Sequence, residues 1–242
     1  MKLIAPDYYP SFTCIASACR HTCCVGWEID VDADSLERFC GDEAVFREID
    51  ETGTPHIRLR EGERCPFLNG DGLCDMILKH GEGYLCDICR DHPRFRNYFT
   101  DRTELGLGLV CEEAARIILF SPAPMRLITL EDDGGKEEIP EDEAWLTDLR
   151  DRMLASVTET GPRARLLEYL IYRHLPDALY DGRTEERVAF IGSSFDEITA
   201  LWDASDGKPE TVTEIVRQWS YDVEYDEEEL ERRIAGKVKK DE

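Results

Sequence analysis

Apolar residues at helical spacing predict most of the elements of this chain. One helix is expected over residues 33–49, with Asp32 or Asp34 as its N-cap, and a second directly after Cys111. From about Ser121 onward the apolar residues keep helical spacing almost throughout. The helices expected there cover residues 140–154, 162–175, 185–202, 211–219 and 227–238.

The chain up to about Phe120 has a different pattern. Turns rich in glycine, proline and asparagine interrupt it, so we expect few long elements there beyond the two helices above. The stretch HIRLR, residues 56–60, alternates apolar and polar positions like a short strand. An acidic, glycine-containing stretch at residues 130–143 is typical of a linker.

The cysteines separate the chain into two chemically different regions. All ten lie between Cys14 and Cys111, and none follows. We therefore expect a mainly α protein with a cysteine-rich, irregular, metal-bound region over residues 1–120 and an α-helical region over residues 121–242.

Charge narrows the range of partners. The chain has 53 acidic and 29 basic residues among 242, a net charge of −24, which argues against nucleic acid. An acidic surface can attract a lysine-bearing protein, or it can simply keep the chain in solution. The sequence has no run long and apolar enough to span a membrane and no secretion signal at its start, so we expect a cytoplasmic protein without a membrane partner.

The cysteine spacing points to metal. Reducing cytosol disfavours disulfides, and Cys86 and Cys89 form a CxxC turn that can present two thiolates to one ion or cluster. Structural zinc and an iron–sulfur cluster both accept four thiolates. The ligand spacing is unequal and includes the adjacent pair Cys23 and Cys24, unlike the paired CxxC turns of zinc ribbons. This favours the iron–sulfur cluster, with zinc as the alternative.

Four blocks of sequence carry a resemblance. They read PDYYPSFTCIASACRHTCCVGWEIDVD, CPFLNGDGLCDM, GEGYLCDICRDHPRFRN and CEEAARIIL, in that order. Together they resemble the bacterial flagellin lysine N-methylase family, over roughly the first half of the chain. The resemblance implies methyl transfer from S-adenosylmethionine to lysine side chains of flagellin or a similar surface protein, by a protein that carries an iron–sulfur cluster, expected to be of the 4Fe-4S type.

The blocks also indicate which cysteines are metal ligands. Cys40 matches no motif cysteine, and the other nine do. The candidate ligands are Cys14, Cys19, Cys23, Cys24, Cys65, Cys74, Cys86, Cys89 and Cys111. His92, three residues after the CxxC, is a second choice as a ligand.

Cations near the thiols have two interpretations. Arg90 and Arg94 follow the CxxC and are our candidates for contact with a cofactor, because a guanidinium can balance an anionic cluster or hold a carboxylate in a bidentate pair. In a chain this acidic they can equally be ordinary salt-bridge partners. Residues that could take the proton from a lysine ammonium are Glu28, Glu82, Glu112 and Tyr84.

The residues alone do not establish a methyltransferase. No GxGxxG turn follows a predicted strand, and the CxxxCxxC spacing of radical enzymes is absent from the sequence. The alternative function is therefore a non-catalytic metal-binding or redox module that docks a protein partner. Binding of S-adenosylmethionine separates the two functions.

Overall fold

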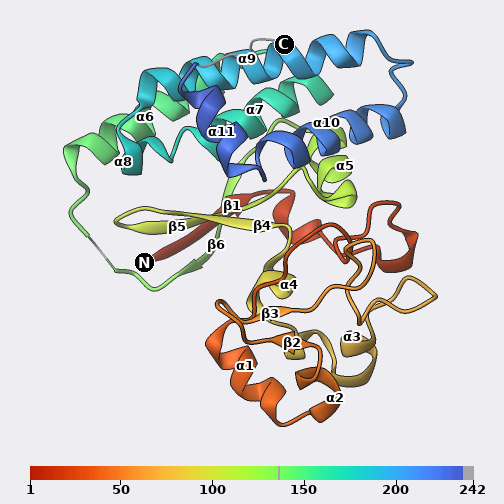
Figure 1. Ribbon diagram of the computed structural model, residues 1–242. Coiled ribbons are helices and arrows are strands. Elements are labelled where there is room, and N and C mark those ends of the chain that lie inside the picture. Colours follow the sequence, from red (N-terminus) through yellow and green to blue (C-terminus); the bar gives the residue numbers. More distant parts are fainter. Residues whose placement is uncertain (136, 237–242) are drawn as a thin grey trace. The chain divides into compact units, whose positions relative to one another are not determined.

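The computed structural model describes residues 1–135 and 137–236, which form two compact units (Figure 1). Unit 1 consists of Met1–Thr13 and Pro93–Glu242, and unit 2 of Cys14–His92. These bounds differ from the regions expected at residues 1–120 and 121–242. The expected regions were drawn from where the cysteines lie in the sequence, whereas the units are defined by how the chain packs. The chain enters unit 2 directly from the first strand of unit 1 and its short 3-10 turn, and later returns to the same sheet.

Unit 1 contains a four-stranded mixed sheet that the sequence did not predict. Strand β1 pairs in parallel with β5, and the β4–β5 and β1–β6 pairs are antiparallel. The strand order is β4 (Arg94–Tyr98), β5 (Arg102–Leu107), β1 (Lys2–Pro6) and β6 (Leu127–Asp132). Strand β6 includes residues 130–132, so the linker expected at residues 130–143 is wrong at its start. The same strand interrupts the helices expected from about Ser121 onward. Lys136, also in that stretch, lies outside the described residues.

The helices of unit 1 confirm the helical prediction closely. In Figure 1, helices α6 to α11 lie together on one side of the sheet. Helix α5 begins directly after Cys111, as expected, and α7 packs against both α5 and α9. Residues 237 and 238 of the last expected helix lie outside the described residues. The helices are α5 (Glu112–Phe120), α6 (Glu141–Ser156), α7 (Pro162–His174), α8 (Ala178–Asp181), α9 (Thr184–Asp203), α10 (Pro209–Val223) and α11 (Glu227–Ile234).

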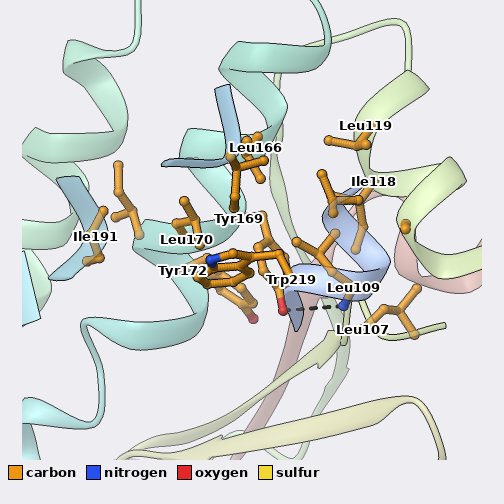
Figure 2. Close-up of a cluster of buried hydrophobic side chains, with 14 of the residues drawn as sticks. Leu107, Leu109, Ile118, Leu119, Leu166, Tyr169, Leu170, Tyr172, Ile191 and Trp219 are labelled. Carbon is orange, nitrogen blue, oxygen red and sulfur yellow. Dashed lines mark hydrogen bonds between the residues drawn. The ribbon is translucent and has the colours of Figure 1, made fainter. Parts of the chain in front are cut away.

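Helix α7 is the centre of the unit 1 core. Its Leu166, Tyr169, Leu170 and Tyr172 side chains are buried together with residues of β5, α5, α9 and α10 (Figure 2). A polar group in such a core is costly unless it forms a hydrogen bond. Tyr172 meets this condition, since its hydroxyl donates to the Leu105 carbonyl at 2.8 Å. The core thus fixes β5 against the helical layer.

Unit 2 is built from short elements. They are α1 (Ala33–Cys40), α2 (Glu43–Phe46), β2 (Ile49–Asp50), β3 (His56–Ile57), α3 (Asp75–His80) and α4 (Asp87–Asp91). Asp32 caps α1 as expected, but the single helix over residues 33–49 is wrong. The Asp42 carboxylate accepts the Ala44 N–H at 3.0 Å and starts a separate helix, α2. The predicted strand at residues 56–60 is confirmed only for its first two residues.

The mainly α class is confirmed, although the sheet of unit 1 adds to it. Within the described residues, no helix is both long enough and apolar enough to cross a membrane.

Candidate functional site

Five of the predicted ligand cysteines share the core of unit 2. Cys65 and Cys86 are buried in it, and Cys24, Cys74 and Cys89 pack against it while half-buried. They come from three of the four sequence blocks, so residues up to 65 positions apart in the chain meet in one place. Thiols in an otherwise apolar core are the setting in which a metal group can be held away from water.

A hairpin turn brings two of these thiols together. The Asn69 side-chain oxygen accepts the backbone N–H groups of Asp71 and Leu73, both at 3.0 Å. This Asx turn reverses the chain, so that Leu68 and Cys74 pair as an antiparallel bridge. The CPFLNGDGLCDM block is therefore a hairpin with Cys65 before the turn and Cys74 after it.

Cys24 reaches the same place by pairing with the start of that hairpin. The Cys65 N–H donates to the Cys24 carbonyl at 2.9 Å, and Val25 pairs antiparallel with Arg64. The Arg64 guanidinium donates to the carbonyls of Leu68 and Asn69 at 3.1 and 2.9 Å and so braces the turn. Sequence reasoning did not single out Arg64, although it directly precedes a ligand-block cysteine.

The CxxC lies on a short helix. Cys86 is the N-cap residue of α4 and Cys89 lies within it. The Asp32 carboxylate accepts the Asp87 N–H at 2.8 Å and, through its other oxygen, the Ser35 N–H at 2.8 Å. One carboxylate thus caps α1 and fixes the start of α4. The sequence indicated the first role of Asp32 and gave no signal for the second.

The thiols in this core differ in acidity. A hydrogen bond from Cys23, helped by Thr22 and the charge of Arg64, lowers the pKa of Cys24 to about 6. The hydrogen bond between Cys89 and Cys86 lowers the pKa of Cys86 and raises that of Cys89. Burial raises the pKa of Cys65 to about 11. Thiolate therefore forms most easily at Cys24 and Cys86.

Burial also raises the pKa of Cys74, which keeps that thiol protonated more readily than an exposed one. Cys23 lies beside these thiols as well, because its side chain forms a hydrogen bond with that of Cys24. Among the described residues, no group of three or more His, Cys, Asp or Glu side chains is arranged to hold a metal ion. The case for metal consequently rests on the donor chemistry and on the shared core.

The remaining predicted residues lie elsewhere. Cys14 is exposed and accepts the Ala16 N–H at 3.4 Å, and Cys19 follows a 3-10 turn in the same segment. Cys111 belongs to unit 1, where it is the N-cap residue of α5. Cys40, expected to be a bystander, is exposed at the end of α1.

The two arginines proposed for cofactor contact have protein partners. Arg90 pairs with Asp87 on α4. Arg94, on β4 of unit 1, lies 5.1 and 5.9 Å from the ring centres of Phe12 and Tyr9. His92 lies near Trp27, with 6.2 Å between the ring centres. These contacts leave the proposed roles of Arg90 and Arg94 as predictions.

Fold and site together define a mainly α protein with clustered thiols in unit 2. Comparison with known proteins gives relatives for half of the chain. The chain is 27% identical over 134 residues to lysine-N-methylases of Salmonella typhimurium and Salmonella choleraesuis, covering 50% of this chain and 33% of each relative. It is 28% identical over 134 residues to the flagellar biosynthetic protein FliU of Salmonella muenchen, covering 50% of this chain and 79% of that protein.

These relatives confirm the resemblance to the flagellin lysine N-methylase family. The match spans about a third of the length of the lysine-N-methylases. No family model and no solved structure matches the chain.

Proposed function

We propose that this protein transfers methyl groups from S-adenosylmethionine to the side-chain amines of lysines in flagellin or a similar surface protein. The observation that carries the proposal is the similarity to proteins named for lysine methylation and for flagellar biosynthesis. The net charge of −24 supports it, because an acidic chain attracts a lysine-bearing protein.

An iron–sulfur cluster in unit 2 is the second part of the proposal. Thiolates are the ligands such clusters require, and four of the five thiols in the core suffice. The residues that would hold it are Cys24, Cys65, Cys74, Cys86 and Cys89. When bound, a cluster of this kind supplies one-electron chemistry and fixes the segments that ligate it. Zinc is the alternative occupant for the same donor set.

Lysine methylation also needs a group that accepts the ammonium proton, because only the neutral amine attacks. Tyr84 is poorly suited to this step. Burial and the nearby Asp42 carboxylate raise the pKa of Tyr84, so the phenol keeps its proton at neutral pH. Glu28, Glu82 and Glu112 are the other residues proposed for this role.

Mass spectrometry of flagellin from the same cell tests the reaction. We expect lysine peptides to gain multiples of one methyl unit when the protein is present and to lose these gains when it is deleted. A Cys86→Ser variant should also lose them, whereas Cys40→Ser, which changes an exposed thiol outside the core, should not. Identical spectra with and without the protein would refute the proposed reaction.

Anaerobic purification with iron and sulfide analysis tests the cluster separately. Iron and sulfide in about equal amounts are expected in the wild-type protein and in Cys40→Ser, with a marked loss in Cys65→Ser. Stoichiometric zinc without sulfide would refute the iron–sulfur cluster and support zinc as the bound metal.

A non-catalytic metal-binding or redox module is the second candidate. It is favoured by one observation, that five cysteines share the core of unit 2, which metal binding alone would account for. Calorimetry with S-adenosylmethionine on the metal-loaded protein separates the two, since the methylase must bind the donor and the module need not.

A further inference from the structure

A cavity of about 310 Å³ lies in unit 1, beside the end of β1 and the last turns of α5. Six of its lining residues decide what it can bind. They are Asp7, Tyr8 and Ser11 from the first segment of unit 1, and Arg116, Ile117 and Phe120 from α5. The volume is at the lower end of the range for small-molecule sites, so a single side chain is a better fit than a large ligand.

The charges around the cavity favour a cation. Arg116 is held by Glu113 in a bidentate pair, with N–O distances of 2.7 and 2.6 Å, so its charge is compensated. Asp7 accepts only a long hydrogen bond, 3.4 Å, from the Arg126 N–H. Within the described part of the chain, Asp7 forms no ion pair. A negative charge is therefore left for a ligand.

The cavity also offers a second oxygen and fixed apolar walls. The Ser11 hydroxyl donates to the Tyr8 carbonyl at 2.6 Å, so its lone pairs remain to accept an N–H. The Arg165 guanidinium lies 5.4 Å from the Tyr8 ring centre, and Glu168 compensates its charge at 2.8 Å. This contact fixes the Tyr8 ring without placing an unpaired positive charge beside the cavity.

We propose that this cavity binds the side chain of a lysine residue of a protein substrate. The ammonium donates to the Asp7 carboxylate and the Ser11 hydroxyl oxygen, and the four-carbon stem lies along Tyr8, Ile117 and Phe120. As a site for the substrate, it rests on the proposed function. Binding of a lysyl side chain is nevertheless measurable by itself.

Titration of the full chain, followed by NMR of its backbone amides, tests the proposal. The probes are Nα-acetyl-lysine methylamide and its neutral isostere Nα-acetyl-norleucine methylamide. We expect the lysine probe to shift the signals of Ser11, Ile117 and Ser121, and the norleucine probe to bind at least about tenfold more weakly. Asp7→Asn should weaken the lysine probe by about tenfold or more, while Asp196→Asn, which removes an exposed acid on α9, should not.

Equal binding of both probes, shifts confined to other residues, or full affinity in Asp7→Asn would overturn the site. S-adenosylmethionine shifting the same signals in competition with the lysine probe would also overturn it, because the donor would then be the occupant. Flagellin methylation that stays unchanged in Asp7→Asn would remove the site and leave the proposed function standing. Lysine binding at the cavity with no flagellin methylation by the wild-type protein would keep the site and refute the proposed function.

Discussion

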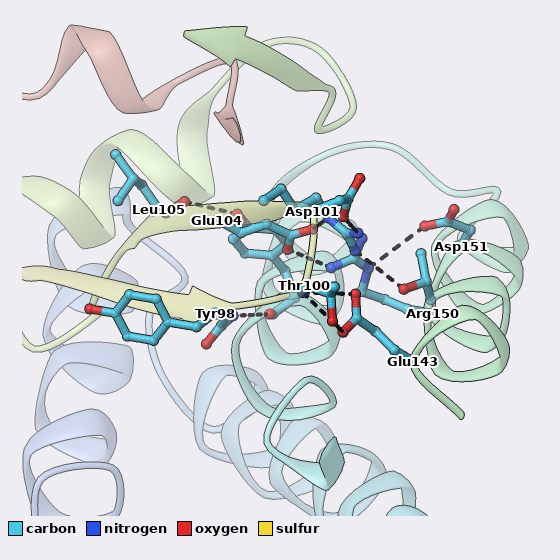
Figure 3. A network of polar contacts seen from close by, with 12 residues as sticks. Tyr98, Thr100, Asp101, Glu104, Leu105, Glu143, Arg150 and Asp151 are labelled. Carbon is cyan, nitrogen blue, oxygen red and sulfur yellow. Dashed lines mark hydrogen bonds and ion pairs between the residues drawn. The ribbon is translucent and has the colours of Figure 1, made fainter. Parts of the chain in front are cut away.

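Glu104 shows how strongly a single residue can depend on its partners. Its side chain is fully buried, accepts from the Arg102 Nε at 2.7 Å, and pairs with the Arg150 guanidinium at 2.5 Å (Figure 3). The network joins β5 to α6 across 46 residues of sequence. A carboxylate in so dry a place is tolerated only because both its oxygens meet a guanidinium.

Glu104→Gln should therefore destabilise the protein by about 3–5 kcal/mol, because it leaves two buried guanidinium groups without their shared anion. Urea denaturation, followed by circular dichroism, measures the free energy of unfolding. Asp151→Asn is the matched control, since Asp151 is an exposed partner of the same Arg150, and should cost less than about 1 kcal/mol. Equal effects of the two substitutions would show that burial does not decide the loss.

Glu224 is a second buried carboxylate, and it predicts a pH dependence. Burial raises the pKa of Glu224. The hydrogen bond from His174 at 2.8 Å, the charge of Arg173 and the Ser220 hydroxyl lower the pKa by more than burial raises it, so the net shift is downward. A folded-state pKa below the ordinary 4.5 means that the ionised Glu224 adds stability above pH 4.5. That stability is lost as the pH falls through the lowered value.

Glu224→Gln should consequently be less stable than wild type at neutral pH, and the difference should shrink in acid below pH 4.5. Urea midpoints measured across this pH range give the comparison. Asp196→Asn, an exposed change of the same charge, should leave the difference from wild type nearly constant with pH. A Glu224→Gln difference that does not change in acid would contradict the assignment.

At the scale of elements, Gly106 limits how β4 and β5 can pack. A Cβ atom at this position would lie 2.0 Å from the Phe95 ring, closer than atoms can approach. Gly106→Ala should destabilise unit 1 by about 2–3 kcal/mol, because the ring must leave its place in the core. Gly192→Ala is the control, since nothing lies within 4 Å of its added methyl group on α9, and it should stabilise by about 0.5–1 kcal/mol. Thermal unfolding compares both; a neutral Gly106→Ala would mean that the Phe95 ring relocates without cost.

The long helices of unit 1 were predictable from this sequence, and its four-stranded sheet was not. The apolar residues of α7 and α10 recur over long segments, and Pro162 marks the start of α7, so local signals suffice. Strand β4 does alternate, with Phe95 and Asn97 buried and its other residues less so, but it is five residues long and follows a cysteine motif. Its pairing with β5, and the parallel pairing of β1 with β5, depend on contacts that no local pattern records.

The candidate site was predictable in its residue types and not in its grouping. The resemblance of the four sequence blocks gave the ligand candidates, and the Asn69 turn explains why Cys65 and Cys74 approach each other. The role of Asp32 in holding α4, and of Arg64 beside Cys24, needs the folded chain, because each joins segments far apart in sequence. The same holds for the cavity at Asp7 and Tyr8, whose walls come from two separate segments.

At the scale of the whole molecule, the two units have different sources of stability. Unit 1 has a large apolar core around α7, whereas the core of unit 2 is smaller and includes two buried cysteines, with three more packed against it. The metal group proposed for unit 2 would add to the stability of this core, because ligation would fix the segments that carry the cysteines.

Removal of the proposed metal group should therefore loosen unit 2 selectively. Anaerobically purified protein, treated with a chelator, is expected to exchange the amide hydrogens around Phe39 and Ile57 at least about tenfold faster, while those around Leu166 and Leu170 keep their rates. Cys65→Ser should show the fast exchange without chelator, since it removes a buried thiol of this core, and Cys40→Ser should behave as wild type. The contradicting outcome is that the chelator removes metal while the amide hydrogens of unit 2 keep their exchange rates. Metal binding by the thiols would then not stabilise the fold of unit 2, and the grouping of the thiols would have to serve the chemistry of the site.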